Sequence, residues 1–492
     1  LFGRNATGGA INFVTRRPDF DEVNGFIDGE YGDYAHQRIK GAINLPITDD
    51  FAVRVAGMWL QRDGYIDNVA FGQVGTDGSR LPGIDDDLDG RDLYSYRITG
   101  EWQFSDRGSV WAMYYRFEED DDRARITNQV CQRTTLPTTG CEPDGFGFDN
   151  PHLGTTTGGI FGGSVGALPF GNNGDLAEYV FPKPPLNDLR RMHTDYDPIF
   201  QDEEDTFAFG LSYDFDRATV TLLGAYQQRE FFSRQDYLMD VGPTLQPTAL
   251  NPEGLWPVSE PAGRAGDNWR AGPCNYNDGT AGVFGGCILD VDQTRVFAFD
   301  QSDSESDYWT IEAKVSTSFD GPFNFTVGVN AYDSESYGDY HVLANTLDLV
   351  TQYPNFFGPP LYPGDFNSTS DPEGGTLQDG WAVFGETYYD ITETLKLTVG
   401  LRFNTDNKEV NDTSVLFNAV DFNTILGGAL GPDPVFVRGL SYGLQAIGVG
   451  TASAADQALA QLYGVDAQLA TAAGAGDLPT ALGLLGQIPL VP

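Results

Sequence analysis

The stretch that decides the fold runs Tyr94-Ser95-Tyr96-Arg97-Ile98-Thr99-Gly100-Glu101-Trp102-Gln103-Phe104. Its even-numbered positions are apolar residues or glycine, and its odd-numbered positions are polar. Because successive side chains of a β-strand point to opposite faces, this pattern predicts a strand with one apolar face and one polar face. The segment is also roughly twice as long as the usual strand of a soluble sheet.

The same alternation recurs along the chain, most clearly in residues 51–59, 206–215, 323–330 and 395–404. Most of the predicted segments are long enough for a tilted strand to cross the hydrocarbon core of a membrane, which takes about 9–11 residues. In all we predict about eleven strands, near residues 24–33, 35–46, 51–63, 92–104, 109–118, 203–215, 218–230, 305–319, 323–336, 380–391 and 395–408.

The connections between these strands alternate in length. Long links are expected at 64–91, 119–202, 231–304 and 337–379 and from about 409, and only the hairpin at Gly32–Ala35 interrupts the rule. Short turns on one side and long loops on the other are typical of outer-membrane β-barrels. The tight connections are Pro46–Asp50, Ser105–Gly108, Asp216–Arg217, Asp320–Pro322 and Thr392–Thr394.

The composition supports a large β-protein with polar loops. The 492 residues include 60 glycines, 33 Phe and 23 Tyr, and the formal net charge is −42. So negative a chain is excluded as a nucleic-acid binder, because a phosphate backbone requires a basic face. No apolar run approaches the roughly 18 residues of a spanning helix.

Charged residues on the polar faces require a wet or plugged interior, because an unpaired charge in a dry core is very costly. We expect aromatic residues near the strand ends to form the interfacial girdles of a barrel. The charged residues are Arg38, Lys40, Arg54, Arg97, Glu101, Arg116, Glu312, Lys314, Glu386, Lys396 and Arg402. The aromatic residues are Trp59, Trp102, Phe104, Trp111, Phe215, Phe319, Trp381 and Phe403.

The first eighteen residues, LFGRNATGGAINFVTRRP, carry a resemblance to a known family. They resemble the end of the plug domain of TonB-dependent outer-membrane receptors of the siderophore type. The hairpin at residues 390–403 is similar to a recurrent hairpin of the same receptors. Matching plug positions include Gly3, Gly8, Gly9, Ile11, Asn12 and Thr15.

The resemblance implies an all-β fold, an antiparallel transmembrane β-barrel of which about 11 of an expected 22 strands are present, with the C-terminal end of a plug domain. It predicts the plug end at 1–18, a partial barrel at 19–408, and an unfinished extracellular loop at 409–492 with a helical insert near Ala454 to Leu469. A signal peptide, a TonB box and most of the plug would precede Leu1. We therefore expect this chain to be an internal fragment.

The family implies import of a scarce solute across the bacterial outer membrane, most often a ferric siderophore, energised by TonB of the inner-membrane complex. The implied partners are TonB, a small-molecule cargo and outer-membrane lipid, and the protein is expected to be a monomer. Two alternatives stay open. A passive porin-like channel would lack the plug, and an outer-membrane barrel enzyme would need a catalytic constellation that the sequence does not offer.

Cysteine usage indicates two loop disulfides, Cys131 with Cys141 and Cys274 with Cys287, because metal ligands usually lie two to four residues apart and include His. The four histidines lie apart from the cysteines, so no catalytic residue, cofactor or metal site is expected. One acidic motif has two possible interpretations. Asp85, Asp87 and Asp89 match the first half of a calcium loop, but a solvated acidic loop is the simpler interpretation.

Three further groups are candidates for function. Glu118 to Asp122 is either a solvated acidic run or an attractor for cations, and Arg4, Arg16 and Arg17 are candidates to pair with Glu312 and Glu386 on the barrel wall. Some loop aromatics are expected to stack on the cargo. These are Tyr237, Trp256, Trp269, Tyr276, Tyr337, Tyr340, Tyr353, Phe356, Phe357 and Tyr362.

Overall fold

The computed structural model describes residues 14–127 without 82, then 130, 132, 142 and 145–147, then 177–245 with gaps at 179, 185 and 187, and finally 291–344, 366–370 and 375–416. Within these ranges every regular element is a β-strand, and no helix is long and apolar enough to cross a membrane. The all-β, antiparallel prediction is confirmed.

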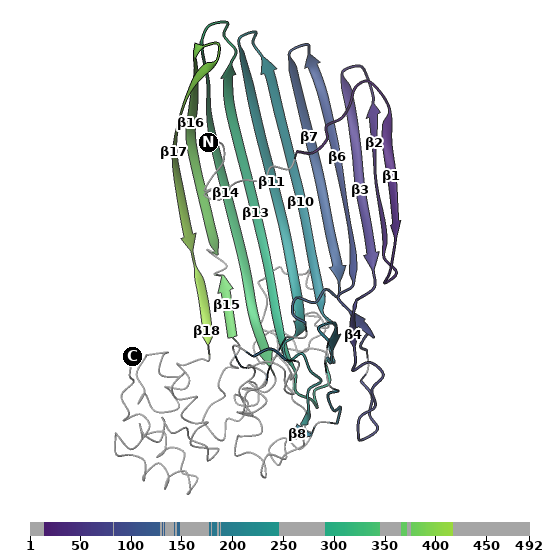
Figure 1. Ribbon diagram of the computed structural model, residues 1–492. Helices are drawn as coiled ribbons and strands as arrows, with labels where there is room; N and C mark the ends of the chain where they lie inside the picture. The colour runs from purple at the N-terminus through teal and green to yellow at the C-terminus, as the bar shows by residue number, and fades with distance from the viewer. Residues whose placement is uncertain are drawn as a thin grey trace, which may run out of the picture.

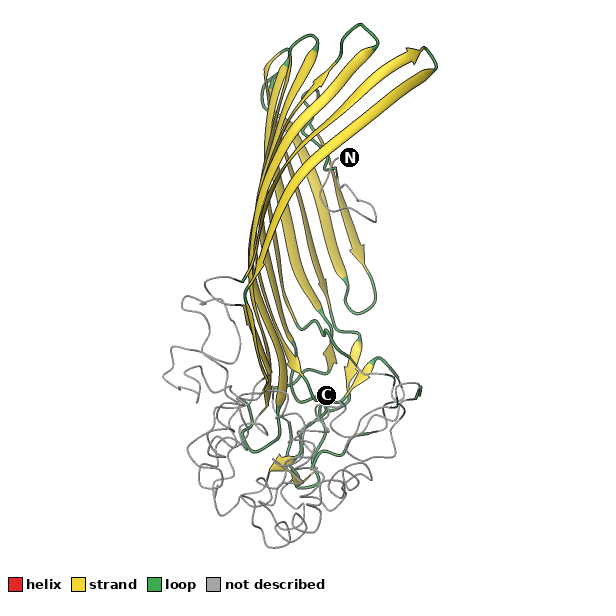
Figure 2. Cartoon of the chain, turned by 90° about the vertical axis from the view of Figure 1, so that its left-hand side faces the viewer, coloured by secondary structure: helices red, strands yellow, loops and turns green. Residues whose placement is uncertain are grey.

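Thirteen strands form one curved sheet (Figures 1 and 2). Eleven of them are long and correspond one to one with the eleven predicted from sequence. Short strands β15 (Phe366–Ser370) and β18 (Asp412–Leu416) complete the sheet. The long strands are β1 (Asn24–Tyr31), β2 (Gln37–Pro46), β3 (Phe51–Arg62), β6 (Arg91–Ser105), β7 (Gly108–Asp121), β10 (Ile199–Asp214), β11 (Ala218–Asp236), β13 (Ala298–Thr317), β14 (Phe323–Ala344), β16 (Thr376–Thr392) and β17 (Leu395–Val410).

The five predicted tight turns all lie at one end of the sheet, drawn at the top of Figure 1. The long connections leave from the other end, which is called the loop end below. Two small sheets lie there, one formed by β5 (Asp87–Leu88), β4 (Ile66–Asn68) and β9 (Arg191–Met192), the other by β12 (Thr244–Leu245) and β8 (Ala177–Glu178). The segregation of loop length is therefore confirmed for the described connections.

Toward the loop end several strands run farther than the sequence predicted. Strand β13 begins at Ala298 and not near 305, and β14 ends at Ala344 and not near 336. The additional residues of β13 from Gln301 to Ser304 are polar on both faces. Hydrogen bonding to the neighbouring strand extends the ladder there without any alternation in the side chains.

The strand register gathers the apolar residues on one face of the sheet. Trp102 lies opposite Phe51 and Val110, and the same face continues through Tyr226 and Trp309. These side chains are exposed, Trp102 at 48% and Trp309 at 42%. A band of exposed apolar side chains along many strands marks a surface that contacts an apolar medium or a partner.

On this apolar face, a row of tyrosines marks where the band ends toward the loop end. The hydroxyl groups of Tyr94, Tyr114 and Tyr226 donate to carboxylates of neighbouring strands, Glu118, Asp205 and Asp307. Beyond this row the face becomes charged. Each tyrosine thus places its aromatic ring at the edge of the apolar band and its hydroxyl group on the polar surface, as aromatic residues do at a membrane interface.

Two sequence assignments of face were wrong. Trp111 lies opposite Gly210 on the polar face, not in a girdle, and Arg116 lies on the face of Tyr114, where it pairs with Asp205 at 2.6 Å and with Glu203. Strand β7 carries apolar residues on both faces around Trp111, so period-two alternation alone could not choose between them.

The apolar cores are small and lie at the loop end, because a single sheet has no second layer to pack against. One cluster joins Tyr196, Phe297, Phe299 and Leu343. Another joins Ile66 and Leu88 to Met192 and Met239. The first cluster ties Tyr196 to the ends of β13 and β14, and the second joins the short strands β4, β5 and β9 to a residue that follows β11.

Gly210 makes room for the indole of Trp111. A Cβ at this glycine would lie 2.1 Å from the Trp111 Nε1, and the indole is itself held under Arg17. We expect Gly210→Val to lower the free energy of unfolding by about 1–3 kcal/mol through overpacking. The measurement is the urea midpoint in detergent. Gly29→Ala, whose Cβ meets nothing within 4 Å, serves as control, and equal midpoints for both variants would contradict the prediction.

Candidate functional site

The segment before β1 is held against the polar face of the sheet by Asn44. This side chain is fully buried, accepts the Asp19 N–H at 2.8 Å, and donates to the carbonyl groups of Asp19 at 2.8 Å and Glu22 at 2.9 Å. Both N–H donors of the amide and one lone pair of its oxygen are thereby used. Asn44 fixes the path by which the chain leaves the interior side and enters the sheet.

Farther back in the same segment, Arg17 reaches β6 and β7 on the polar face, near the tight turn that joins these strands. Its guanidinium group lies 3.7 Å from the Glu101 carboxylate on β6 and 3.8 Å from the ring centroid of Trp111 on β7. Figure 1 shows the segment crossing in front of the strands toward β7. The charge on Arg17 is therefore balanced both by a carboxylate and by an aromatic face.

The carboxylate that Arg17 meets lies outside the predicted set. Glu312 lies 4.0 Å from Lys314, and Glu386 accepts from the Tyr388 hydroxyl at 2.9 Å. Of the predicted plug motif the structure describes Thr15, which is half-buried, and of the predicted arginines Arg16 and Arg17. The other predicted members, Arg4, Gly3, Gly8, Gly9, Ile11 and Asn12, lie outside the described residues.

At the loop end of the polar face, Arg125 connects the β7–β10 link to the sheet. Its backbone N–H donates to Gln235 at 2.8 Å, and its guanidinium group pairs with Asp300, which also accepts from the Tyr340 hydroxyl at 3.0 Å. Tyr340 was predicted as a candidate cargo-stacking residue, and here its hydroxyl joins this polar network.

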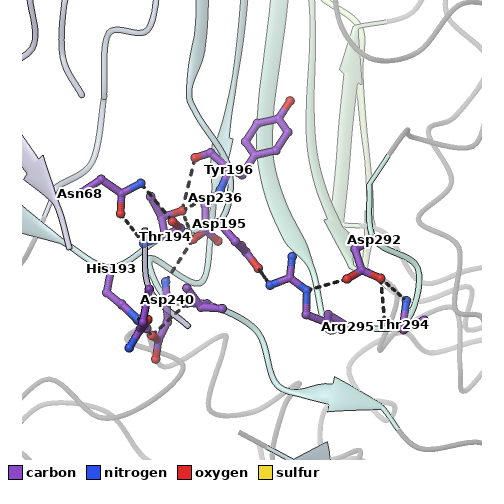
Figure 3. Close-up of polar contacts among 12 residues, drawn as sticks. Asn68, His193, Thr194, Asp195, Tyr196, Asp236, Asp240, Asp292, Thr294 and Arg295 are labelled. Carbon is purple, nitrogen blue, oxygen red and sulfur yellow. Dashed lines mark hydrogen bonds and ion pairs between the residues drawn. The ribbon is translucent and has the colours of Figure 1, made fainter. Parts of the chain in front are cut away.

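A second network is buried among the loop segments (Figure 3). His193 Nδ1 lies 2.6 Å from Asp240, and its Nε2 lies 3.0 Å from the side-chain oxygen of Gln73. Asn68 donates to the Thr194 carbonyl group at 3.1 Å, and the Thr194 hydroxyl donates to Asp236 at 2.7 Å. The network fastens three stretches that are far apart in sequence.

The same network includes a buried ion pair. Arg295 lies 2.9 Å from Asp195 and 3.0 Å from Asp292, and both Arg295 and Asp195 are almost fully buried. Burial raises the pKa of Asp195, and the Arg295 charge opposes that shift. A paired, buried arginine of this kind fixes the geometry of the loops more than it adds stability.

The chemistry available to His193 argues against catalysis at this place. A histidine next to a carboxylate is part of many nucleophilic sites, but there the second nitrogen faces a serine or cysteine. Here Gln73 occupies that position and the ring is fully buried. The dyad therefore holds loops together and does not activate a nucleophile.

The three aspartates of the calcium-like motif take separate roles. Asp89 is buried and pairs with Arg91 at 2.9 Å, Asp87 accepts the Gly64 N–H at 3.1 Å, and the Asp85 N–H donates to Asp197 at 3.0 Å. Calcium needs six to eight converging oxygens, and this distribution does not supply them. Since Asp89 is 3% exposed, the motif is not a fully solvated loop either.

The acidic run at the end of β7 is also more structured than a solvated surface. Glu119 is only 4% exposed and lies between Arg91, at 3.9 Å, and Arg123, at 3.6 Å. Asp122 accepts the Gly90 N–H at 2.7 Å. The prediction that the whole run is solvated was therefore wrong for Glu119. Its ion-pair partners are Arg91 on the neighbouring strand β6 and Arg123, four residues later in the chain.

Several sequence predictions fall outside the described residues. These are both disulfides, the helical insert, and most loop aromatics, namely Cys131, Cys141, Cys274, Cys287, Trp256, Trp269, Tyr276, Tyr353, Phe356, Phe357 and Tyr362. Sequence reasoning in turn missed Asn44, the Arg17 site on Trp111, and the His193 dyad. A polar residue in an otherwise apolar hairpin, as at Asn44, was the one available signal.

Solved structures with a similar fold are outer-membrane receptors. The ferric yersiniabactin uptake receptor FyuA from Yersinia pestis has a TM-score of 0.43 and 13% identity over 81% of this chain and 42% of its own. The ferric-catecholate import receptor Fiu from Escherichia coli K12 has a TM-score of 0.42 and 13% identity over 84% of this chain and 45% of its own. No family model and no curated protein matches the sequence.

The ferripyoverdine receptor of the outer membrane of Pseudomonas aeruginosa is a further likeness, with a TM-score of 0.41 and 9% identity over 82% of this chain and 40% of its own. In fold, this chain is similar to such receptors. It spans less than half the length of the solved chains that it matches. With TM-scores below 0.5, these likenesses do not by themselves assign a function.

The loop end should respond to pH through Asp197. Burial raises its pKa to about 7, and the charges of Asp85 and Asp122 act in the same direction. A folded pKa above the unfolded value stabilises the fold at low pH, and this contribution is lost as pH rises through about 7. We expect Asp197→Asn to slow hydrogen exchange at the Asp85 amide relative to the wild type at pH 8, and to slow it much less at pH 5, where the folded-state carboxyl is still protonated.

The control is Asp106→Asn, which lies in a turn at the opposite end of the sheet. It should leave the Asp85 amide unchanged at both pH values. An equal effect of Asp197→Asn at pH 5 and pH 8 would contradict the role given to the buried charge.

Proposed function

We propose that this chain is the front half of a TonB-dependent receptor that imports a scarce solute, most often a ferric siderophore in such receptors, across the bacterial outer membrane. In this proposal residues 1–18 are the end of the plug, 19–408 the first half of the barrel, and 409–492 an extracellular loop. The barrel closes with strands that lie beyond this chain. The protein acts as a monomer embedded in outer-membrane lipid.

The observation that carries the proposal is the docking of the segment before β1 on the polar face. A porin needs no chain crossing its interior, whereas a plugged receptor must hold one there. Asn44 binds the segment next to β1, and Arg17 reaches Glu101 and Trp111 deeper in the face. The segment thus lies where the end of a plug would enter the barrel wall.

The membrane assignment is supported by the sheet itself. Its apolar face is exposed, its long strands have between 8 and 22 residues, and a tilted spanning strand needs about 9–11. All backbone groups in the middle of the sheet are paired with neighbouring strands, as a lipid environment demands. In this proposal the outer interface of the membrane lies beside the tyrosine row, toward the loop end.

The contacts of the docked segment suggest how it could be both fixed and released. Asn44 is buried, and each of its hydrogen bonds is worth about 1 kcal/mol. Arg17 is 40% exposed and lies at the edge of ion-pair distance from Glu101, so that pair is worth less, at most about 1 kcal/mol. Pulling by TonB would detach the Arg17 contacts first, with Asn44 as the pivot.

The cargo class rests on the family resemblance, and the loop end is compatible with it. Aromatic and polar side chains such as Tyr237 and Tyr340 lie at the ends of β11 and β14. Gln73 lies against His193 Nε2, so this histidine gives the enzyme alternative no support. TonB would contact a segment that precedes Leu1.

Energised import predicts that uptake of the cognate iron chelate by iron-starved cells requires both this protein and TonB. Deleting TonB should abolish uptake, because the plug closes the barrel until it is pulled. The measurement is accumulation of radioactive iron with a panel of ferric siderophores. Uptake that persists without TonB would favour the porin-like alternative, as would ion conductance of the purified protein in planar bilayers.

The Arg17 contact predicts a charge-reversal pattern. Arg17→Glu in the complete receptor should place two carboxylates together on the polar face, lower uptake several-fold and increase leakage of large antibiotics. Combining it with Glu101→Arg should restore much of the loss. Arg107→Glu, in an exposed turn, is the control. If the double variant is as impaired as the sum of the single ones, Arg17 and Glu101 do not act together.

A further inference from the structure

Two carboxylates and one imidazole meet at the loop end of β13 and β14. Asp303 lies directly opposite Asp339 in the strand register, and His341 follows two residues later on the same strand. All three side chains therefore project from the same face of the sheet. One ligand atom from each lies within 4.8 Å of the other two.

The cluster is buried, and apolar side chains form part of its surroundings. Asp303 is 7% exposed and His341 3% exposed, and Phe232, which lies opposite Asp303 on β11, is fully buried. Leu343 follows His341 on the same face and packs with Phe299 in an apolar cluster. The cluster lies beyond the apolar band and the tyrosine row, outside the part of the sheet proposed to face lipid.

Two buried carboxylates directly opposite each other require a positive charge close by. Like charges directly opposite each other on neighbouring strands destabilise a sheet, and burial increases that cost. Arg234 is a cation on the same face, where it lies opposite Gln301 and donates to its side-chain oxygen at 2.8 Å. A metal ion bound between the two carboxylates would compensate their charge directly.

We propose that Asp303, Asp339 and His341 bind a divalent transition-metal ion. The donor set of two carboxylate oxygens and one imidazole nitrogen suits zinc and related ions, whereas calcium and magnesium prefer oxygen ligands alone. Three protein ligands leave room for water or a further ligand. The ion would link β13 to β14 where both strands extend beyond the membrane.

The proposal departs from the expectation that the chain has no metal site. Sequence spacing gave no hint, because Asp303 and Asp339 are 36 positions apart and only the hairpin register brings them together. The site does not depend on the import proposal, since a barrel of any function could use a metal to fasten two long strands.

The test uses the complete protein, purified in detergent, stripped with a chelator and titrated with zinc chloride. The expected result is one equivalent bound by the wild type. His341→Ala and Asp303→Asn should each weaken binding at least about tenfold, since even outer-shell changes cost 10–100-fold. Asp333→Asn, which lies on the same face of β14 farther from the loop end, and His36→Gln should bind zinc as the wild type does.

A measurement on the unaltered protein guards against variants that fail to fold. Zinc-edge X-ray absorption of the loaded wild type should show oxygen ligands together with an imidazole, and cobalt should give a d–d absorption band that zinc displaces. Absence of stoichiometric zinc binding to the wild type would overturn the proposal and leave Arg234 as the compensating charge. Equal binding by wild type, His341→Ala and Asp303→Asn would overturn it as well.

Discussion

The backbone hydrogen-bond ladder between neighbouring antiparallel strands is the constraint on which the rest of the structure depends. In lipid a backbone group has no water to bond, so every strand in the membrane must be paired along its whole spanning length. Among the described strands from β1 to β17, the register shifts only near the tight turns of β6–β7 and β16–β17. Continuous pairing is also what keeps each strand's apolar residues on a single face.

Because one face of the sheet contacts lipid, the polar side chains of the strands must lie on the other face. The interior face carries Asn44, Arg54 and Glu101, and these would be prohibitive in a dry core. The segment that precedes β1 satisfies the hydrogen bonds of Asn44 to that segment and brings Arg17 to 3.7 Å from Glu101. The same alternation that makes the outside apolar therefore creates, on the inside, the binding surface for the docked chain.

Period-two alternation was sufficient to predict the eleven long strands and the segregation of loop length, because both follow from side-chain patterns along single segments. It failed where two faces had similar character, as at Trp111 and Arg116 in β7, and where strands became polar on both faces, as in β13 before Glu305. The contacts of Arg17, His193 and Asp303 depend on partners distant in sequence. Register and loop packing decide those contacts, and neither can be read from one strand.

The change of character along a single face links the membrane-facing part of the sheet to its loop end. On β13 the apolar face runs from Ile311 and Trp309 to Asp307, then to Glu305 and Asp303. A carboxylate at Asp307 can be stabilised by water and by the Tyr226 hydroxyl, but Asp303 is only 7% exposed and cannot be hydrated in the same way. Along β13 the face thus changes from the lipid-facing part at Trp309, through a solvent-accessible part at Asp307, to a buried zone at Asp303. A charged group that water stabilises near Asp307 needs a charge partner in the buried zone. Arg295 pairs with Asp195 in that zone, and Asp303 lies opposite Asp339 there.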